Sequence, residues 1–309
     1  MIFRGETARF LFSGPLPGPK KPRLNFNGLP PIIHRMKIIY SPACLEFEAP
    51  GHPESPRRLE RAAAYLQKLG YTFIDPRPCS EEDLLRVHSA TLVEEVKNLD
   101  FVSLDTPRYP GIYEYAKLAV GGALTAADEG GFSLMRPPGH HAGHDFLGGF
   151  CYFNNIAAAV QKSARTTLII DIDGHHGNGT QDIFKNSERV TCISLHKTGY
   201  PGTGLTSGRQ YYNNMFHGEV GDTTYIHNLQ AMLDHLPRAE QVAVSAGFDA
   251  YRKDPLASLG LSTEGFERIG RSIRRLGLPV FCVLEGGYAV DDLGENIHRF
   301  ISGLEGVKE

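Results

Sequence analysis

Cysteine is scarce in this sequence, and its arrangement excludes two kinds of site. The 309 residues contain five cysteines, an odd number, and no two of them form a C-x-x-C pair. They are Cys44, Cys79, Cys151, Cys192 and Cys282. This usage argues against a disulfide framework and against a zinc site built from cysteines, and it favours a reduced, cytoplasmic setting.

Charge and hydropathy exclude two further classes of protein. The net charge is -3, from 32 basic and 35 acidic residues, and no run of Lys or Arg is dense enough to indicate direct nucleic-acid binding. No apolar stretch approaches the roughly 20 residues that span a bilayer. The N-terminus lacks the basic segment and apolar core of a secretory signal. We therefore predict a protein that binds neither nucleic acid nor membrane directly.

Residues 1–35 differ in composition from the rest of the chain. The stretch from Ser13 to Pro31, SGPLPGPKKPRLNFNGLPP, is dense in Pro and Gly and lacks apolar periodicity, which is typical of extended or disordered chain. Met36 comes directly before KIIYS, the first convincing strand. Residues 1–35 are therefore either a disordered extension or the product of a start codon assigned too far upstream. Residues 36–309 are predicted to form one catalytic domain.

Short apolar runs alternate with amphipathic helical stretches after Met36. Strands are predicted at 37–41, 132–135, 167–172, 190–195, 241–246 and 279–284. Helices are predicted near 56–68, 81–98, 113–129, 153–164, 179–186, 223–235, 262–276 and 290–304. The strands are nearly continuous in apolar character, as are parallel strands that are buried on both faces. The alternation predicts an α/β fold, a single domain with a central parallel sheet flanked by helices on both faces.

Three of the predicted strands end directly in clusters of polar residues. The three stretches are TTLIIDIDGHHGNG, QVAVSAGFDAYRKDP and PVFCVLEGGY. Ligands of open α/β sheets bind outside the carboxyl ends of the strands. The coincidence of three such clusters therefore predicts a functional site at this edge of the sheet.

The first of these clusters has the pattern of a metal site. Asp171, Asp173 and His175 alternate, so that their side chains can point to one side of an extended backbone, and Asp249 ends a second strand. Two carboxylates and one imidazole suit Zn²⁺ or Fe²⁺, and three protein ligands would leave a coordination position open for water. An acid after a strand can also cap a helix or form an ion pair, but that explanation fits three strand ends together less well.

Paired histidines lie in a second cluster, RPPGHHAGHDFLGGFCYFNN at 136–155. His140 and His141 fall in a loop rich in Gly and Pro, where neither helix nor strand explains them. A pair of imidazoles beside a metal site indicates acid–base chemistry, whereas His144 is interpreted as structural.

These blocks together resemble the histone deacetylase family, which has an arginase-like fold. The segments that carry the resemblance are RPPGHHAGHDFLGGFCYFN, DIDGHHGNGTQDIF, SAGFDAYRKDPLASLGLS and LEGGY. They occur in the family's order, and the resemblance runs from about Met36 to the C-terminus. It is closer to class II and bacterial members than to class I.

The resemblance implies an active centre that hydrolyses acyl amides, most simply acetyl-lysine in proteins or peptides, with release of acetate and a free amine. One Zn²⁺ per chain would be held by Asp173, His175 and Asp249. The implied catalytic residues are His140 and His141, Tyr288 as donor to the substrate carbonyl, and the histidine partners Asp171 and Asn178. Tyr288 would stabilise the developing oxyanion, a contact worth about 3–4 kcal/mol in comparable sites.

The resemblance also implies residues that contact the substrate and a second ion. Gly149, Phe150 and Tyr200 would form the walls of a narrow acyl-lysine tunnel, and Asp105 would hold the substrate backbone at its rim. A structural K⁺ would be bound by Asp171 and Ser194, together with backbone oxygens of Asp173, His175 and Leu195.

Two positions depart from patterns found elsewhere in the family. Asn178 stands where class I members have an Asp, and a neutral amide should leave His141 uncharged near pH 7, whereas Asp171 favours the charged form of His140. Leu256 stands where polyamine deacetylases have a Glu, and this apolar residue favours an acyl-lysine stem over a polyamine cation. The segment HKTGYP is also shorter than usual, and RQYYNNMFHGEVGD differs from the family's usual sequence.

Three other functions remain as alternatives. An acetylpolyamine amidohydrolase would share the same site, and a catalytically weak acyl-lysine binding module is disfavoured by the presence of Tyr288. A binuclear manganese hydrolase would need further acids in a D-x-H-x-D pattern, whereas this chain has DIDGHHGN. The sequence leaves open the acyl-chain length, the choice of Zn²⁺ or Fe²⁺ and the oligomeric state.

Overall fold

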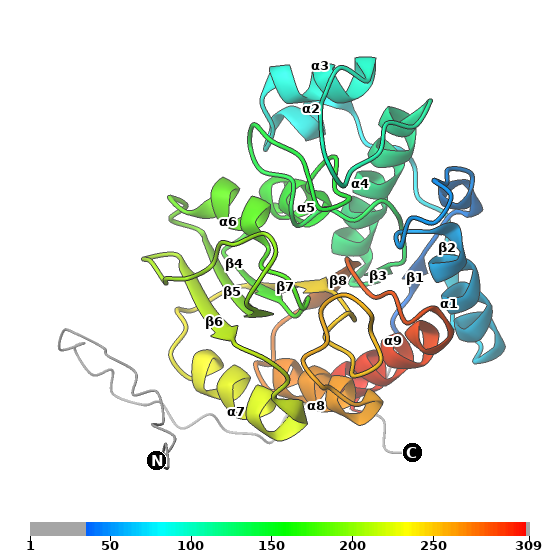
Figure 1. Ribbon diagram of the computed structural model, residues 1–309. Helices are drawn as coiled ribbons and strands as arrows, with labels where there is room; N and C mark the ends of the chain where they lie inside the picture. Colours follow the sequence, from blue (N-terminus) through cyan, green and yellow to red (C-terminus); the bar gives the residue numbers. More distant parts are fainter. Residues whose placement is uncertain (1–34, 307–309) are drawn as a thin grey trace, which may run out of the picture. The chain divides into compact units, whose positions relative to one another are not determined.

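A central sheet of parallel strands runs through residues 35–306, the part of the chain that the computed structural model describes (Figure 1). Within this part, eight strands pair in the order β2-β1-β3-β8-β7-β4-β5-β6. They are β1 (Ile38–Ile39), β2 (Phe73–Ile74), β3 (Phe132–Ser133), β4 (Thr167–Asp171), β5 (Val190–Lys197), β6 (Tyr211–Phe216), β7 (Gln241–Ala246) and β8 (Val280–Leu284). The predicted α/β class is confirmed. The predicted extension at 1–35 lies outside the described residues except for Arg35.

The central strands are apolar because both faces of the sheet are covered. Every residue of β4 and of β7 is buried, which accounts for their nearly continuous apolar sequences. The register places Asp171 at the end of β4 between Ser194 of β5 and Ser245 of β7. Since β8, β7 and β4 are neighbours in the sheet, their three polar carboxyl ends lie side by side.

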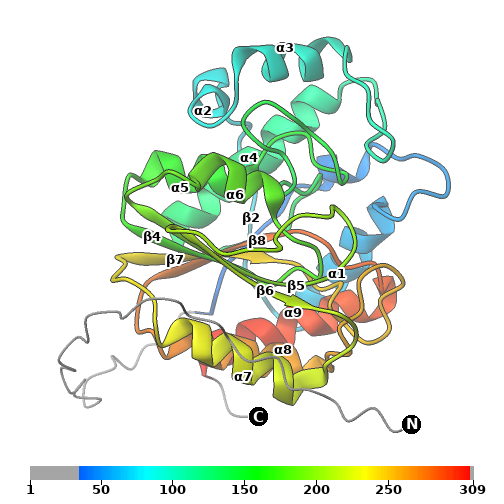
Figure 2. The same cartoon turned by 60° about the vertical axis from the view of Figure 1, so that its left-hand side comes forward.

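Helices pack on both faces of the sheet in two groups that Figure 2 shows in profile. One group consists of α1 (Pro56–Lys68), α7 (Gly221–Leu233), α8 (Thr263–Arg274) and α9 (Val290–Glu305). The other consists of α2 (Glu81–Leu85), α3 (Ala90–Asn98), α4 (Ile112–Glu129), α5 (Asn155–Ser163) and α6 (Asn178–Phe184). A 3₁₀ turn, η1 (Pro42–Leu45), precedes α1. The buried apolar side chains form two cores, one for each group of helices, and α4 also contributes Leu118 and Ala119 to the core of the first group.

The structure differs from the sequence prediction at the sheet edges and in one helix. The edge strands β2 and β6 were not predicted, because β2 has two residues and β6 is only partly buried and carries Asn213 and Asn214. The predicted helix at 81–98 is two helices, α2 and α3. The Ser89 side chain accepts a hydrogen bond from the Leu92 N–H, so Ser89 caps a new helix instead of continuing the first.

Two further features concern membrane-spanning helices and the cysteines. Between residues 35 and 306, helices long and apolar enough to cross a membrane are absent. The five cysteines all lie in this part of the chain, and each is buried and free.

Candidate active site

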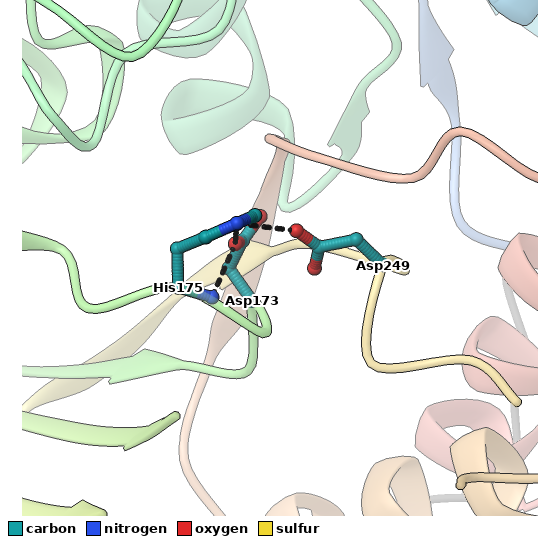
Figure 3. Close-up of side chains that lie close together, drawn as sticks. All are labelled: Asp173, His175 and Asp249. Carbon is teal, nitrogen blue, oxygen red and sulfur yellow. Dashed lines mark hydrogen bonds and ion pairs between the residues drawn. The ribbon is translucent and has the colours of Figure 1, made fainter. Parts of the chain in front are cut away.

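Three side chains converge at the carboxyl ends of β4 and β7 (Figure 3). Asp173 and His175 follow β4, and Asp249 follows β7, its neighbour in the sheet. One ligand atom from each residue lies within 4.8 Å of the others. We call these three residues the acid–histidine cluster. The ladder between two buried strands fixes their spacing, so the cluster is part of the core of the fold.

Backbone N–H groups hold both carboxylates of the cluster in place. Asp173 Oδ2 accepts a hydrogen bond of 2.8 Å from the Gly286 N–H, and Asp249 Oδ1 accepts one of 2.6 Å from the Gly174 N–H. The Nδ1 atom of His175 lies 2.7 Å from Asp249 Oδ2 and 3.2 Å from Asp173 Oδ1. His175 Nδ1 therefore faces the carboxylates of both Asp173 and Asp249.

The remaining oxygen of Asp249 provides a test of whether a cation fits this cluster. Asp249 Oδ2 is buried, and despite its short distance to His175 it has no hydrogen-bond partner among residues 35–306. A buried acceptor without a donor is costly, and a cation bound by this oxygen and by His175 Nδ1 would remove that cost. Burial alone would lower the pKa of His175, but the carboxylates of Asp249 and Asp173 outweigh it and raise that pKa to about 11. The cluster therefore strongly favours positive charge.

Glycines keep the space around the cluster open. A Cβ atom at Gly286 would lie 2.6 Å from Asp173 Oδ2 and 2.8 Å from Asp249 Oδ2. A Cβ atom at Gly247 would lie 2.0 Å from Asp173 Oδ2. Two carboxylates and an imidazole in such a cradle are a donor set typical of hydrolytic zinc sites. The residues thus fit the metal that the sequence predicted.

The paired histidines lie beside the cluster, with ring centroids 4.0 Å apart. His140 Nδ1 lies 2.9 Å from Asp171 Oδ2, and His141 Nδ1 lies 2.7 Å from the side-chain oxygen of Asn178. An amide oxygen can only accept, so His141 carries its proton on Nδ1 and presents an unprotonated Nε2.

The two imidazoles differ in charge because their surroundings differ. Burial alone would lower the pKa of His140, but the Asp171 and Asp173 carboxylates raise it to about 10. Burial and the neighbouring His140 hold the pKa of His141 well below its usual value. The pair therefore combines a charged imidazole with a neutral one that can accept a proton.

A cavity of about 260 Å³ opens onto the cluster and the histidines. It is lined by Asp105, Pro138, His140, His141, Gly149, Phe150, Asp173, His175, Tyr200, Leu256, Gly286 and Tyr288. The structure thus brings the predicted tunnel and rim residues together around one cavity. Asp171 and Asn178 lie behind the histidines and contact them directly.

The walls of the cavity are close-packed against the catalytic candidates. The Tyr200 ring lies edge-on to His141 at 5.3 Å, and the Phe150 ring lies edge-on to Tyr288 at 5.9 Å. Gly149 has φ +57°, and a Cβ atom there would lie 2.2 Å from His141 Cδ2. Only glycine can therefore occupy this position without moving His141.

The residues that hold Tyr288 in place were not predicted from the sequence. The Arg58 guanidinium donates to the carbonyl oxygens of Gly287 at 2.7 Å and Glu285 at 2.6 Å, and lies 4.7 Å from the Tyr288 ring centroid. Asp254 Oδ2 accepts a hydrogen bond of 2.6 Å from the Tyr288 N–H. Burial raises the pKa of the Tyr288 phenol well above its usual value, so the phenol stays a donor.

A buried ion pair network anchors Arg58 in turn. Glu54 lies 3.0 Å from Arg58 and 2.8 Å from Arg136, and all three side chains are buried. A sequence signal for Arg58 exists, because it falls on the same face of α1 as the buried Ala62 and Leu66. Its two carbonyl partners lie more than 200 residues away, and spacing along the chain cannot identify them.

We predict that Arg58→Ala lowers the free energy of unfolding by about 3 kcal/mol, because it leaves buried carbonyls and Glu54 without a donor. Chemical denaturation measures this loss. Arg61→Ala is the matched control on the same helix, since Arg61 is exposed and lies 4.0 Å from Asp291. It should cost less than about 1 kcal/mol. Equal losses in the two variants would contradict the role of the network.

The residues predicted to bind potassium lie behind the cluster. Asp171 pairs with Ser194 in the register between β4 and β5, and Leu195 follows on β5. The Ser194 hydroxyl lies 2.9 Å from His196 Nδ1. The structure therefore places these side chains next to one another, and the ion itself remains a prediction.

Comparisons with known proteins identify the family of this chain. The family model "Histone deacetylase domain" matches residues 52–304. A "Probable deacetylase" of Methanothermobacter thermautotrophicus is 37% identical over 88% of this chain and 91% of its own length. "Acetylpolyamine amidohydrolase 1" of Pseudomonas aeruginosa is 36% identical over 67% of each chain. The crystal structure of the HDA15 HD domain superposes with a TM-score of 0.81 at 33% identity and covers 89% of both chains. The chain therefore belongs to the histone deacetylase family and is a hydrolase that acts on amides.

Proposed function

We propose that this protein is a zinc-dependent deacylase that hydrolyses acetyl-lysine in proteins or peptides and releases acetate and a free amine. The observation that carries the proposal is the convergence, in one cavity, of the acid–histidine cluster with a charged and a neutral histidine and with Tyr288. An acyl-lysine reader without activity would not need a neutral imidazole paired with a phenol donor beside the cluster.

Zinc held by Asp173, His175 and Asp249 would polarise the amide carbonyl and make water more acidic. The residues of the chain then divide the proton chemistry. His141 takes a proton from water at Nε2 and later delivers it to the leaving amine. His140, charged and fixed by Asp171, adds positive charge where the oxyanion develops.

Tyr288 supplies the hydrogen bond to the carbonyl oxygen as negative charge builds up on it. Its backbone is held by Asp254 and its ring lies beside Arg58. The Tyr288 side chain is therefore already positioned before the reaction begins. Such preorganised donors are effective because they need not reorient when the charge appears.

The walls of the cavity favour a slender apolar stem. Gly149, Phe150 and Tyr200 would enclose the lysine chain, Leu256 would contact it near the surface, and Asp105 would accept N–H groups of the substrate backbone. An acetylpolyamine is a second candidate, supported by the names of the amidohydrolase relatives, but Leu256 offers no charge to a distant ammonium group. A structural K⁺ at Asp171, Ser194 and the nearby carbonyls completes the proposal.

A panel of substrates tests this function. Purified protein is offered acetyl-lysine peptides, monoacetylated diamines and longer acyl-lysine peptides, and release of the free amine is measured. We expect the highest kcat/KM for the acetyl-lysine peptides. Turnover of the diamines alone would favour the polyamine function. Tight hydroxamate binding without any turnover would instead favour a reader.

A further inference from the structure

His52 is partly buried next to the cavity, and both of its ring nitrogens are used. Its Nδ1 accepts a hydrogen bond of 3.2 Å from the Glu54 N–H. A backbone N–H can only donate, so Nδ1 is unprotonated and the proton is on Nε2. Nε2 lies 3.1 Å from the backbone oxygen of Asp105, to which it donates. The imidazole therefore bridges two segments that are about fifty residues apart in the sequence.

The segment that His52 contacts holds one wall of the cavity. We call residues 103–106 the rim segment and residues 148–151 the wall segment. Asp105 Oδ1 accepts a hydrogen bond of 3.0 Å from the Gly149 N–H, and the Thr106 hydroxyl accepts one of 3.0 Å from the Phe150 N–H. A shift of the rim segment would therefore move the wall segment with it.

The ring of His52 also contacts the wall segment directly. Its centroid lies 4.5 Å from that of Phe150, edge-on at 75°. Phe150 has φ +71°, an unfavourable backbone conformation for a residue with a side chain, so neighbouring contacts must hold it there. Phe150 in turn lies edge-on to Tyr288.

His52 is itself hydrogen-bonded to the segment that carries the buried ion pair network. Its Nδ1 partner is the backbone of Glu54, whose side chain is fixed between Arg58 and Arg136. Arg58 holds the turn that carries Tyr288. The imidazole thus connects a buried ion pair network to the outer, partly exposed rim of the cavity.

We propose that His52 is a positioning residue that sets the mouth of the cavity for substrates carrying a peptide backbone. It does not line the cavity and acts through Asp105 and Phe150. The proposal rests on the proposed deacylase function. Substrates that need the Asp105 carboxylate depend on its position, whereas a monoacetylated diamine has no backbone amide to place there.

Two substitutions separate the two hydrogen bonds of the imidazole. His52→Asn puts an amide oxygen near the position of Nδ1 and keeps the bond to the Glu54 N–H, but has no group that reaches Asp105. His52→Gln puts an amide nitrogen near the position of Nε2 and can donate to the Asp105 carbonyl. His217→Asn, at an exposed histidine, is the matched control.

We expect His52→Asn to raise KM for an acetyl-lysine peptide by about three- to tenfold, as for the loss of one hydrogen bond, with a much smaller effect on kcat. The ratio of kcat/KM for the peptide to that for monoacetylated diaminobutane should fall, and His52→Gln should restore part of it. Metal content should equal that of the wild type. Hydrogen exchange should become faster in the rim and wall segments and stay unchanged at the ends of β4 and β7.

Several results of these experiments would contradict the proposal. Wild-type KM and wild-type exchange in His52→Asn would overturn the proposal. A fall in kcat together with metal content would also overturn it, because the effect would then lie in the acid–histidine cluster. If His52→Asn does not fold, His52→Phe takes its place, because it keeps a ring beside Phe150 and has no donor for the Asp105 carbonyl. Faster rim exchange and a raised KM in that variant decide in favour of the proposal, and wild-type values decide against it. A wild-type protein that turns over no acyl amide would instead overturn the deacylase function, and the substrate claim with it.

Discussion

Replacing Asp249 by alanine is expected to remove the bound metal ion almost completely, from about one per chain in the wild type, and to abolish activity with it. The Asp249 carboxylate contributes one of the three candidate ligands found among residues 35–306, and its Oδ2 lies 2.7 Å from His175 Nδ1. The variant leaves an aspartate and a histidine, which is too small a donor set for a tightly held zinc ion. Metal analysis of the purified proteins measures the loss.

Asp234→Ala is the control for this experiment, because Asp234 is an exposed aspartate at the end of α7. It should keep the metal content and the activity of the wild type. Unchanged metal content in Asp249→Ala would reject the assignment of Asp249 as a ligand. Loss of metal without loss of activity would mean that the ion has no part in the reaction.

Tyr288→Phe is expected to lower kcat by about 10²–10³ while metal content stays unchanged. The substitution removes only the phenol oxygen, so the ring contacts with Phe150 and Arg58 remain. The lost contact forms as charge develops, and its removal should therefore affect kcat more than KM. Steady-state kinetics on an acetyl-lysine peptide and metal analysis measure the two quantities.

Tyr212→Phe provides a matched control, since Tyr212 lies on β6 and packs against the core away from the cavity. A hydroxamate, which binds metal through two oxygens, should bind the wild type and Tyr288→Phe with similar affinity. Turnover by Tyr288→Phe at the wild-type rate would mean that the proposed mechanism does not apply to this chain.

The sequence predicted the inner part of the fold well and its edges poorly. Buried strands such as β4 and β7 have short, nearly continuous apolar runs, which are typical of parallel strands covered on both faces, and polar residues follow them directly. The edge strand β6 reads YYNNMF and lacks such a run, because only one of its sides is paired. Its pairing depends on the neighbouring strand β5, from Cys192 to Lys197, which local sequence does not encode.

The same contrast holds for the candidate site. The acid–histidine cluster lies within two short stretches, and the resemblance to a known family identified its residues. Arg58 and His52 could not be found in this way, because each acts through backbone atoms of distant segments. A hydrogen bond to a carbonyl oxygen places no requirement on the identity of the partner residue, so the partner leaves no signature in the sequence.

The acid–histidine cluster and the outer residues of the cavity lie on different segments, which has a consequence for how the substrate range of such a protein can change. The acid–histidine cluster lies directly after two buried strands, whereas Asp105, Phe150, Tyr200 and Leu256 lie on four separate loop segments outside the cluster. Exchange of one of these loop segments with that of a relative can therefore alter substrate range while the geometry of the cluster is conserved. Directed evolution of new substrate selectivities should accumulate its changes in four segments, at 99–111, 148–151, 198–210 and 250–262. A library confined to these segments should retain metal binding in most of its members.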